Sequence, residues 1–237
     1  MDDQIQLLKD IEHSLKTPIN GAYARIQTLL RQDAPPEAVR RQLFAIRGLC
    51  ARARQLLRTI DLFDRLHRNE PLHLRLTRLS PRELIATLVN AVEDAEILMS
   101  PERGVRFEVD TASLEVIESR TVLADLDLLE QAIRAILDNA SKYSFVNTIV
   151  MIGGLIVEGG SFQLRFQNKG LKILPEETAL CVQRGWRGEN AQLCTAEGSG
   201  LGLWLVDNIM RAHHGRVIIN PTTPDGTTEI GLVLPTS

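Results

Sequence analysis

The stretch LLEQAIRAILDNASKYS, residues 128–144, decides the fold class of this chain. Its apolar residues recur every three or four positions, which is the spacing of one buried face of an amphipathic helix. They are Leu129, Ala132, Ile133, Ile136, Leu137 and Ala140. Polar residues gather near the end of the stretch: Asp138, Asn139, Lys142 and Tyr143. The pattern predicts a helix over about residues 125–143, with one face in a core and a polar cluster near its C-terminal end.

Extended and helical segments alternate on both sides of this helix. Strands are expected at GVRFEV (104–109), near 148–157 and 161–167, at GRVIIN (215–220) and at TTEIGLVL (227–234). Further helices are expected near 81–99, 176–184 and 201–213, and a short extended segment over 72–76. Alternation of this kind predicts an α/β sandwich with a mixed sheet.

The first 70 residues have a purely helical pattern. Apolar residues spaced by threes and fours run from Ile5 to Leu29 and again from Val39 to Phe63, and RQDAPPEA (31–38) interrupts them. Two long antiparallel helices are therefore expected. A hairpin of this size buries little core alone, so we expect a homodimer in which two hairpins form a four-helix bundle. The domain boundary is expected near residue 70, giving domains 1–70 and 71–237.

Composition excludes several functional classes. The chain has 237 residues, 44% hydrophobic and 24% charged, as globular proteins do. Its net charge of −3 gives no indication of nucleic-acid binding. Cys50, Cys181 and Cys194 lack the spacing of a zinc or disulfide pattern, which favours a cytoplasmic location. No apolar run approaches the roughly 20 residues that cross a bilayer, so no membrane insertion is expected.

Two motifs in the second domain suit phosphate chemistry. The amide oxygen of Asn139 is a suitable ligand for Mg²⁺, and Lys142 lies one turn later, where it can reach phosphate oxygens. EGSGLGL (197–203) places glycines before a helix whose apolar stripe is Leu203, Val206, Ile209 and Met210, and backbone N–H groups there can approach phosphate. The alternatives are a solvated helix face and an ordinary tight turn. Residues 185–200 have little periodicity and suit a mobile lid.

HSLKTPI, residues 13–19, stands out in the first helix. His13 lies almost opposite the apolar stripe at 100° per residue, so it is expected to point outward. A lone exposed histidine is commonly a surface residue. Pro18, however, removes the N–H that would bond residue 14, so the helix is expected to bend or loosen beside His13.

HSLKTPI, LDNASKYS and GSGLGL, in this order and rough spacing, resemble the catalytic region of bacterial sensor histidine kinases. The resemblance implies a dimerisation and histidine-phosphotransfer hairpin followed by a Bergerat-type domain that binds ATP and Mg²⁺. It places the phosphoacceptor at His13, with Lys16 and Thr17 beside it, and the magnesium ligand at Asn139. It implies a nucleotide-binding set of Asn139, Lys142, Tyr143, Asn168, Gly170, Gly198, Gly200, Leu201, Gly202 and Thr227. Trp186 and Thr227 match its aromatic box and closing strand loosely.

The sequence departs from the family pattern at four positions. Ser14 stands where an acidic residue usually follows the phosphoacceptor and helps take its proton. Asn168 replaces the aspartate that recognises the adenine amino group and keeps an acceptor oxygen without the charge. Lys172 replaces the last glycine of the same box, and Ala135 replaces the first asparagine of the preceding motif.

Two functions follow from the resemblance. One is a kinase that phosphorylates His13 from Mg-ATP and passes the phosphoryl group to an aspartate of a response-regulator receiver domain. The other is a degenerate relay or docking protein, or a response-regulator phosphatase, with weak or no ATP binding; Thr17 matches the position that orients water for that reverse reaction. No sensor domain is evident, so the input is expected from an upstream sensor domain or partner protein.

Overall fold

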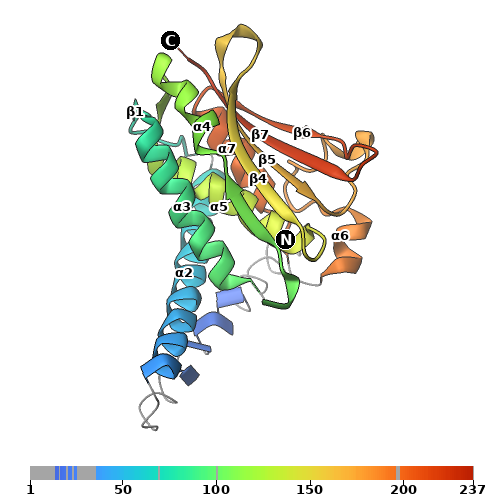
Figure 1. The fold of residues 1–237 in the computed structure, drawn as a ribbon. Coiled ribbons are helices and arrows are strands. Elements are labelled where there is room, and N and C mark those ends of the chain that lie inside the picture. The colour runs from blue at the N-terminus through green and yellow to red at the C-terminus, as the bar shows by residue number, and fades with distance from the viewer. Residues whose placement is uncertain are drawn as a thin grey trace. The chain divides into compact units, whose positions relative to one another are not determined.

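The structure, a computed structural model, describes residues 14–15, 17–19, 21–22, 24–25, 36–68, 70–99, 101–195 and 198–236. The chain forms two compact units, Met1–Glu70 and Pro71–Ser237. Figure 1 colours them along the chain from blue to red. Each unit is described separately below.

The first unit is helical in its described residues up to His67. α2 spans Pro36–His67, and the described residues between 14 and 25 are helical as well. Gly21 packs against the Leu49 side chain, and Arg25 Nη1 donates a hydrogen bond to Gln42 Oε1 (3.2 Å). Gly21 meets Leu49, whereas Arg25, later in the first segment, meets Gln42, earlier in α2. The two helical segments therefore run antiparallel. The four-helix bundle and the homodimer stay predictions.

The second unit is built on a mixed five-stranded sheet of order β2-β4-β5-β7-β6. The β2–β4 pair is parallel and the other pairs are antiparallel. The strands are β1 (Thr77–Arg78), β2 (Arg106–Val109), β3 (Leu123–Ala124), β4 (Ile149–Ile156), β5 (Phe162–Lys169), β6 (Arg216–Asn220) and β7 (Thr227–Leu234). β1 and β3 pair separately. The mixed α/β sandwich expected from the sequence is confirmed.

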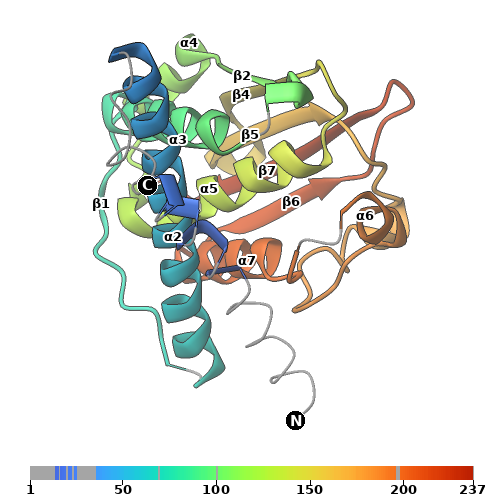
Figure 2. The same cartoon turned by 90° about the horizontal axis from the view of Figure 1, so that it is seen from below.

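Helices cover one face of this sheet, as Figures 1 and 2 show for α3, α5 and α7. The helices are α3 (Pro81–Leu98), α4 (Thr111–Leu114), α5 (Leu126–Tyr143), α6 (Glu189–Cys194) and α7 (Gly202–Ala212). Short 3₁₀ turns span Pro101–Arg103, Glu115–Ser119, Glu158–Gly160 and Pro175–Glu177. The six apolar residues predicted for α5 are all buried. They form the core between the helices and the inward-facing side chains of β5 and β7.

Two predicted elements differ from the structure. No α-helix forms over 176–184; a 3₁₀ turn is followed by turns held by i,i+3 bonds such as Leu180 N to Glu177 O (2.9 Å). The first turn of α7 also differs. Leu203 was expected to begin the buried stripe, but Leu205 is buried instead. Leu203 instead lines the pocket described below.

His213 joins the end of α7 to the start of α5. Its Nδ1–H donates to the Ile209 carbonyl (2.8 Å), and its Nε2 accepts from the Asp125 backbone N–H (2.9 Å). The ring is 2% exposed, so water cannot replace either bond.

We therefore expect His213→Leu to lower the free energy of unfolding by about 1–3 kcal/mol, since a buried donor and acceptor lose their partners. Urea unfolding followed by circular dichroism measures this. His214→Asn is the control, because His214 is exposed and asparagine tolerates its positive φ of 56°. Equal unfolding midpoints for the two variants would contradict the role given to His213.

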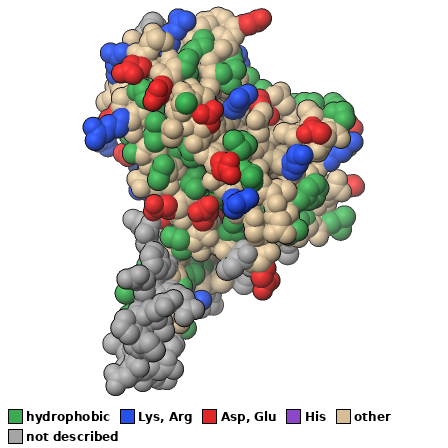
Figure 3. All heavy atoms as spheres, in the orientation of Figure 1, with side chains coloured by type: hydrophobic (Ala, Val, Ile, Leu, Met, Phe, Trp, Pro, Cys, Tyr) green, Lys and Arg blue, Asp and Glu red, His purple; other side chains and the backbone are tan. Residues whose placement is uncertain are grey.

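The surface of the second unit carries both signs of charge. Figure 3 shows acidic and basic side chains interspersed on its visible face. In the part of the chain that the structure describes, no helix has an apolar stretch long enough to cross a membrane.

Candidate functional site

A pocket lies where the C-terminal half of α5, the inner face of β5 and β7, and the start of α7 meet. The segment from Leu171 to Ala191 forms its remaining wall and includes the beginning of α6, which Figure 1 shows at one side of the domain. All of these elements belong to the second unit. The pocket thus gathers residues that are up to about 90 positions apart in the sequence.

One end of the pocket is apolar. Its wall consists of Ile136, Phe166, Leu171, Ile173, Cys181, Ile230 and the Trp186 side chain. Phe166, Cys181 and Ile230 are buried in the domain. A slot of this kind suits a flat, weakly polar ring, because burying apolar surface is favourable.

The other end combines Asn139 with the glycine loop before α7. Gly202 lies against Asn139: a Cβ at Gly202 would be 3.7 Å from its Nδ2 and 3.8 Å from its Oδ1. Gly198 and Gly200, which also line the pocket, have φ values of 139° and 66°. The loop therefore presents backbone rather than side chains beside the positive end of α7, which favours anions.

Lys142 lines the pocket on the same side as Asn139. Its Nζ forms an ion pair with Asp138 Oδ2 (2.5 Å), one turn back on α5. The ammonium group is thus held at the pocket, where it can also meet a phosphate. Tyr143 lines the pocket as well, and a Cβ at Gly198 would lie 3.5 Å from its hydroxyl.

Two polar side chains from the sheet enter the apolar end. Asn168 on β5 and Thr228 on β7 are directly paired residues in the antiparallel ladder, so both face the helices. Asn168 Nδ2 lies 3.0 Å from Ser144 Oγ, and Thr228 Oγ1 lies 2.7 Å from Thr222 Oγ1. Both pairs can hydrogen-bond to the edge of a bound ring.

The structure places three of the predicted binding residues away from the pocket surface. Thr227 is on the outer face of β7, where its hydroxyl donates to Asp225 Oδ2 (2.7 Å). Hydrogen bonds from Thr223 and then Thr227 lower the pKa of Asp225. Alternation along the strand therefore puts Thr228, not Thr227, on the pocket wall.

Gly170 and Leu201 support the pocket without lining it. A Cβ at Gly170 would lie 2.4 Å from the Tyr143 carbonyl oxygen, so only glycine lets the end of β5 approach α5 this closely. Leu201 is 2% exposed and anchors the start of α7 in the core. His13 and Lys16 lie outside the described residues, and Thr17 is exposed on a helical segment of the first unit.

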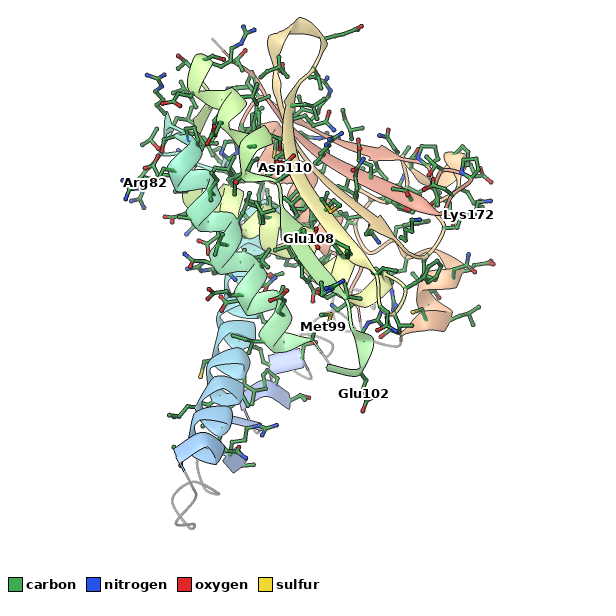
Figure 4. The ribbon with its side chains drawn as sticks, viewed as in Figure 1. Arg82, Met99, Glu102, Glu108, Asp110 and Lys172 are labelled. Carbon is green, nitrogen blue, oxygen red and sulfur yellow. The ribbon has the colours of Figure 1, made fainter. Side chains whose placement is uncertain are left out.

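Several lining residues were not predicted as site residues from the sequence. Thr228, Cys181 and Arg187 are among them. Arg187 Nη2 donates to the carbonyls of Ala191 (3.1 Å) and Thr195 (2.6 Å), which ties α6 to the pocket wall. Lys172 is exposed at the pocket, on the side of the domain that carries α6 (Figure 4).

The buried thiol of Cys181 has an unusual pKa. Desolvation, followed by the nearby charge of Glu177, raises the pKa of Cys181 to about 11. We expect iodoacetamide at pH 8 to modify the exposed Cys194 at least about 100 times faster than Cys181, because the thiolate is the nucleophile. Peptide mass spectrometry after timed quenching measures both rates in one sample. Similar rates in the folded protein would contradict this burial.

The pocket residues fit a magnesium nucleotide. Among the described residues no group of three or more His, Cys, Asp or Glu side chains could hold a metal ion. Mg²⁺ commonly keeps several waters and is held by one or two protein oxygens together with substrate phosphates. The Asn139 side chain has one oxygen of this type beside the glycine loop, and the loop leaves space where side chains would otherwise project.

Comparison with known proteins agrees with this geometry. Residues 124–237 match the family described as "Histidine kinase-, DNA gyrase B-, and HSP90-like ATPase". The chain is similar to proteins named as sensor histidine kinases. It is 28% identical over 238 residues to the signal transduction histidine-protein kinase/phosphatase MprB of Mycolicibacterium vanbaalenii, covering 98% of this chain and 46% of that one. It is 27% identical over 223 residues to the sensor-like histidine kinase SenX3 of Mycobacterium bovis, covering 92% and 51%.

Solved histidine kinases share the fold. The mycobacterial sensor histidine kinase MprB superposes with a TM-score of 0.53 at 23% identity, covering 69% of this chain and 98% of that one. Full-length ShkA in complex with AMPPNP gives 0.56 at 22% identity, covering 98% and 46%. At these identities the likeness concerns the fold alone. The chain spans about half the length of its histidine kinase relatives MprB and SenX3.

Proposed function

We propose that this chain is a protein-histidine kinase of a two-component system, which binds Mg-ATP in the pocket and phosphorylates His13. The observation that supports it most is the meeting of Asn139, Lys142 and the glycine loop at one end of an apolar slot. A purely structural domain has no need of this combination. The family of the nucleotide domain and the named relatives support the same activity.

This proposal gives a role to Asn139, Lys142, the glycine loop and the apolar slot. Mg²⁺ would neutralise charge on the phosphate oxygens. The Asn139 oxygen would ligate the ion, and Lys142 would exchange part of its contact with Asp138 for a phosphate oxygen. Backbone N–H groups from Gly198 to Gly202 would donate to the remaining oxygens. The adenine ring would lie in the apolar slot, with its edge at Asn168 and Thr228.

The phosphoryl transfer would involve the first unit. An imidazole nitrogen of His13 would attack the γ-phosphorus in line; the N–P bond forms, the bond to the ADP oxygen breaks, and the imidazole loses its proton. We place Lys16 and Thr17 beside this histidine in the catalytic set. The phosphohistidine would then pass its group to an aspartate of a receiver domain, with the hairpin as the docking and homodimer surface and an upstream sensor as input.

Transfer to His13 can be tested directly. The full chain is incubated with Mg²⁺ and γ-labelled ATP beside the His13→Ala variant. We expect label that is stable to alkali and labile to acid, as an N–P bond is, in the wild type alone. Label that persists in His13→Ala would remove His13 from this role.

Ser14 is expected to limit the rate of this step. A neutral hydroxyl accepts the imidazole proton poorly, whereas a carboxylate on the neighbouring residue can act as a base. We therefore expect Ser14→Glu to raise the initial rate of label incorporation by about tenfold or more, within the range of general-base catalysis. Ser14→Gln, of the same size without charge, is the control. Equal rates for both variants would show that proton removal does not limit transfer.

A further inference from the structure

The two polar side chains at the apolar end of the pocket are neither charged nor fixed in hydrogen-bond direction. Asn168 and Thr228 face each other across β5 and β7 and both line the pocket. The following inference rests on the proposed function, because it concerns which nucleotide base this end of the site accepts.

Asn168 can present either of its amide groups to a ligand. The neighbouring residue Ser144 is 3% exposed, and its Oγ lies 3.0 Å from Asn168 Nδ2. A hydroxyl both donates and accepts. When Ser144 accepts from Nδ2, the amide oxygen is available to the pocket; when Ser144 donates to the oxygen, the NH₂ group is available instead.

Thr228 has the same freedom. Its hydroxyl is 2.7 Å from the Thr222 hydroxyl, and either can be the donor. Thr222 Oγ1 also accepts from the Ile173 backbone N–H (2.8 Å), so it stays in place in both arrangements. When Thr222 donates, Thr228 keeps its own hydrogen for a ligand; when Thr228 donates to Thr222, it offers only a lone pair.

The carboxylates that line the pocket are engaged elsewhere. Asp138 is paired with Lys142 (2.5 Å). Glu177 Oε2 accepts from the Leu174 backbone N–H (2.9 Å) in the 3₁₀ turn. Neither carboxylate is a cross-strand partner of Thr228, whereas Asn168 is its direct partner in the β5–β7 pair. At this pair of residues the edge of a bound base would therefore meet one amide and one hydroxyl, neither of which is charged.

We propose that the site accepts guanine as well as adenine nucleotides. Adenine presents an N6 donor and an N1 acceptor, which match the Asn168 oxygen and the Thr228 hydroxyl hydrogen. Guanine presents an O6 acceptor and an N1–H donor, which match the Asn168 NH₂ group and the Thr228 lone pair. Rotation of two hydroxyls and one amide turns the first pattern into the second, and the Asn168–Ser144 and Thr222–Thr228 hydrogen bonds are kept in both.

Calorimetric titration of the full chain with Mg-ATP, Mg-GTP and Mg-CTP at one pH and salt concentration tests this. We expect dissociation constants for ATP and GTP within about tenfold of each other, since the position-6 and N1 groups of both bases find matching partners. CTP is expected to bind at least about tenfold more weakly, because its smaller ring covers less of the apolar wall.

Asn168→Asp tests the residue itself. A carboxylate only accepts, so it faces guanine O6 with a repelling charge; we expect the ratio of the GTP to the ATP dissociation constant to rise at least about 30-fold. Asn90→Asp adds the same charge on α3, at an exposed position outside the pocket lining, and is expected to leave the ratio unchanged. An unchanged ratio in Asn168→Asp would overturn the assignment to Asn168. If that variant does not fold, the wild-type constants decide.

The outcomes separate this inference from the proposed function. Wild-type binding of ATP with GTP at least about 100-fold weaker would overturn the inference and leave the kinase proposal standing. Equal binding of ATP, GTP and CTP would show that the base is not read, and would also overturn it. Absence of binding by every nucleotide would overturn the proposed function and the inference together.

Discussion

In the Asn139→Ala variant, Mg²⁺-dependent ATP binding and label transfer to His13 are expected to fall at least about 100-fold, the usual effect of removing one preorganised polar group from a catalytic site. Asn139 is the asparagine that faces the glycine loop, with Gly202 against its amide group. Alanine is a good helix former, so α5 is expected to keep its structure. Calorimetry with and without Mg²⁺ measures the binding, and labelled ATP measures the transfer.

Asn90→Ala is the matched control for this experiment. Asn90 is exposed on α3 and outside the pocket lining, so its replacement is expected to leave both measurements unchanged. The contradicting result would be that Asn139→Ala binds ATP and transfers label as the wild type does, and still requires Mg²⁺. Another residue would then hold the ion, and the role given to Asn139 would be wrong.

The Gly200→Ala variant is expected to fold and to bind Mg-ATP at least about 30-fold more weakly, because a bulkier loop loses its phosphate contacts. Gly200 has a φ of 66°, and a Cβ there would lie 2.5 Å from the backbone carbon of Gly185. The Gly185 N–H donates to the Gly200 carbonyl (3.1 Å), so the clash also separates the loop from the wall that carries Trp186.

Gly226→Ala separates the effect of backbone strain from that of the clash. Gly226 has a φ of 86°, but nothing lies within 4 Å of a Cβ at this position, which is in the turn before β7. We expect this variant to be strained to a similar degree, about 1–2 kcal/mol, and to bind the nucleotide normally. Equal affinities of the two variants would show that the contact with Gly185 is not needed for the site.

The helices of the core could be predicted from the sequence because their burial follows one period. All six apolar residues of the α5 stripe are buried. α7 departs from its predicted stripe only in its first turn, where Leu203 faces the pocket and Leu205 enters the core. At the start of α7, Leu203 thus lines the pocket although the helical period assigns this position to the core.

The sequence pattern alone is enough to predict that Thr228, and not Thr227, lines the pocket. Ile230, Leu232 and Leu234 are the inward residues of β7, and a period of two places Thr228 on their side. The prediction of Thr227 came from a motif match rather than from this alternation. The structure shows the consequence, because Thr227 bonds to Asp225 on the outer face.

Other parts of the site depend on contacts that no local pattern encodes. Asn168 meets Ser144 across 24 positions of the chain, and Ile173 meets Thr222 across 49. Cys181 and Arg187 lie in a segment of successive turns, where neither a period of two nor one of 3.6 reveals which side chains point inward. The helix expected over 176–184 falls in this segment, where the structure has a 3₁₀ turn followed by further turns.

A calorimetric titration of the full chain with ATP, in the presence and absence of Mg²⁺, tests whether the pocket is a magnesium-nucleotide site. We expect saturable binding at one site per chain, which weakens when Mg²⁺ is removed and falls at least about 100-fold in Asn139→Ala. No saturable binding of ATP at millimolar concentrations with Mg²⁺ present would contradict this expectation.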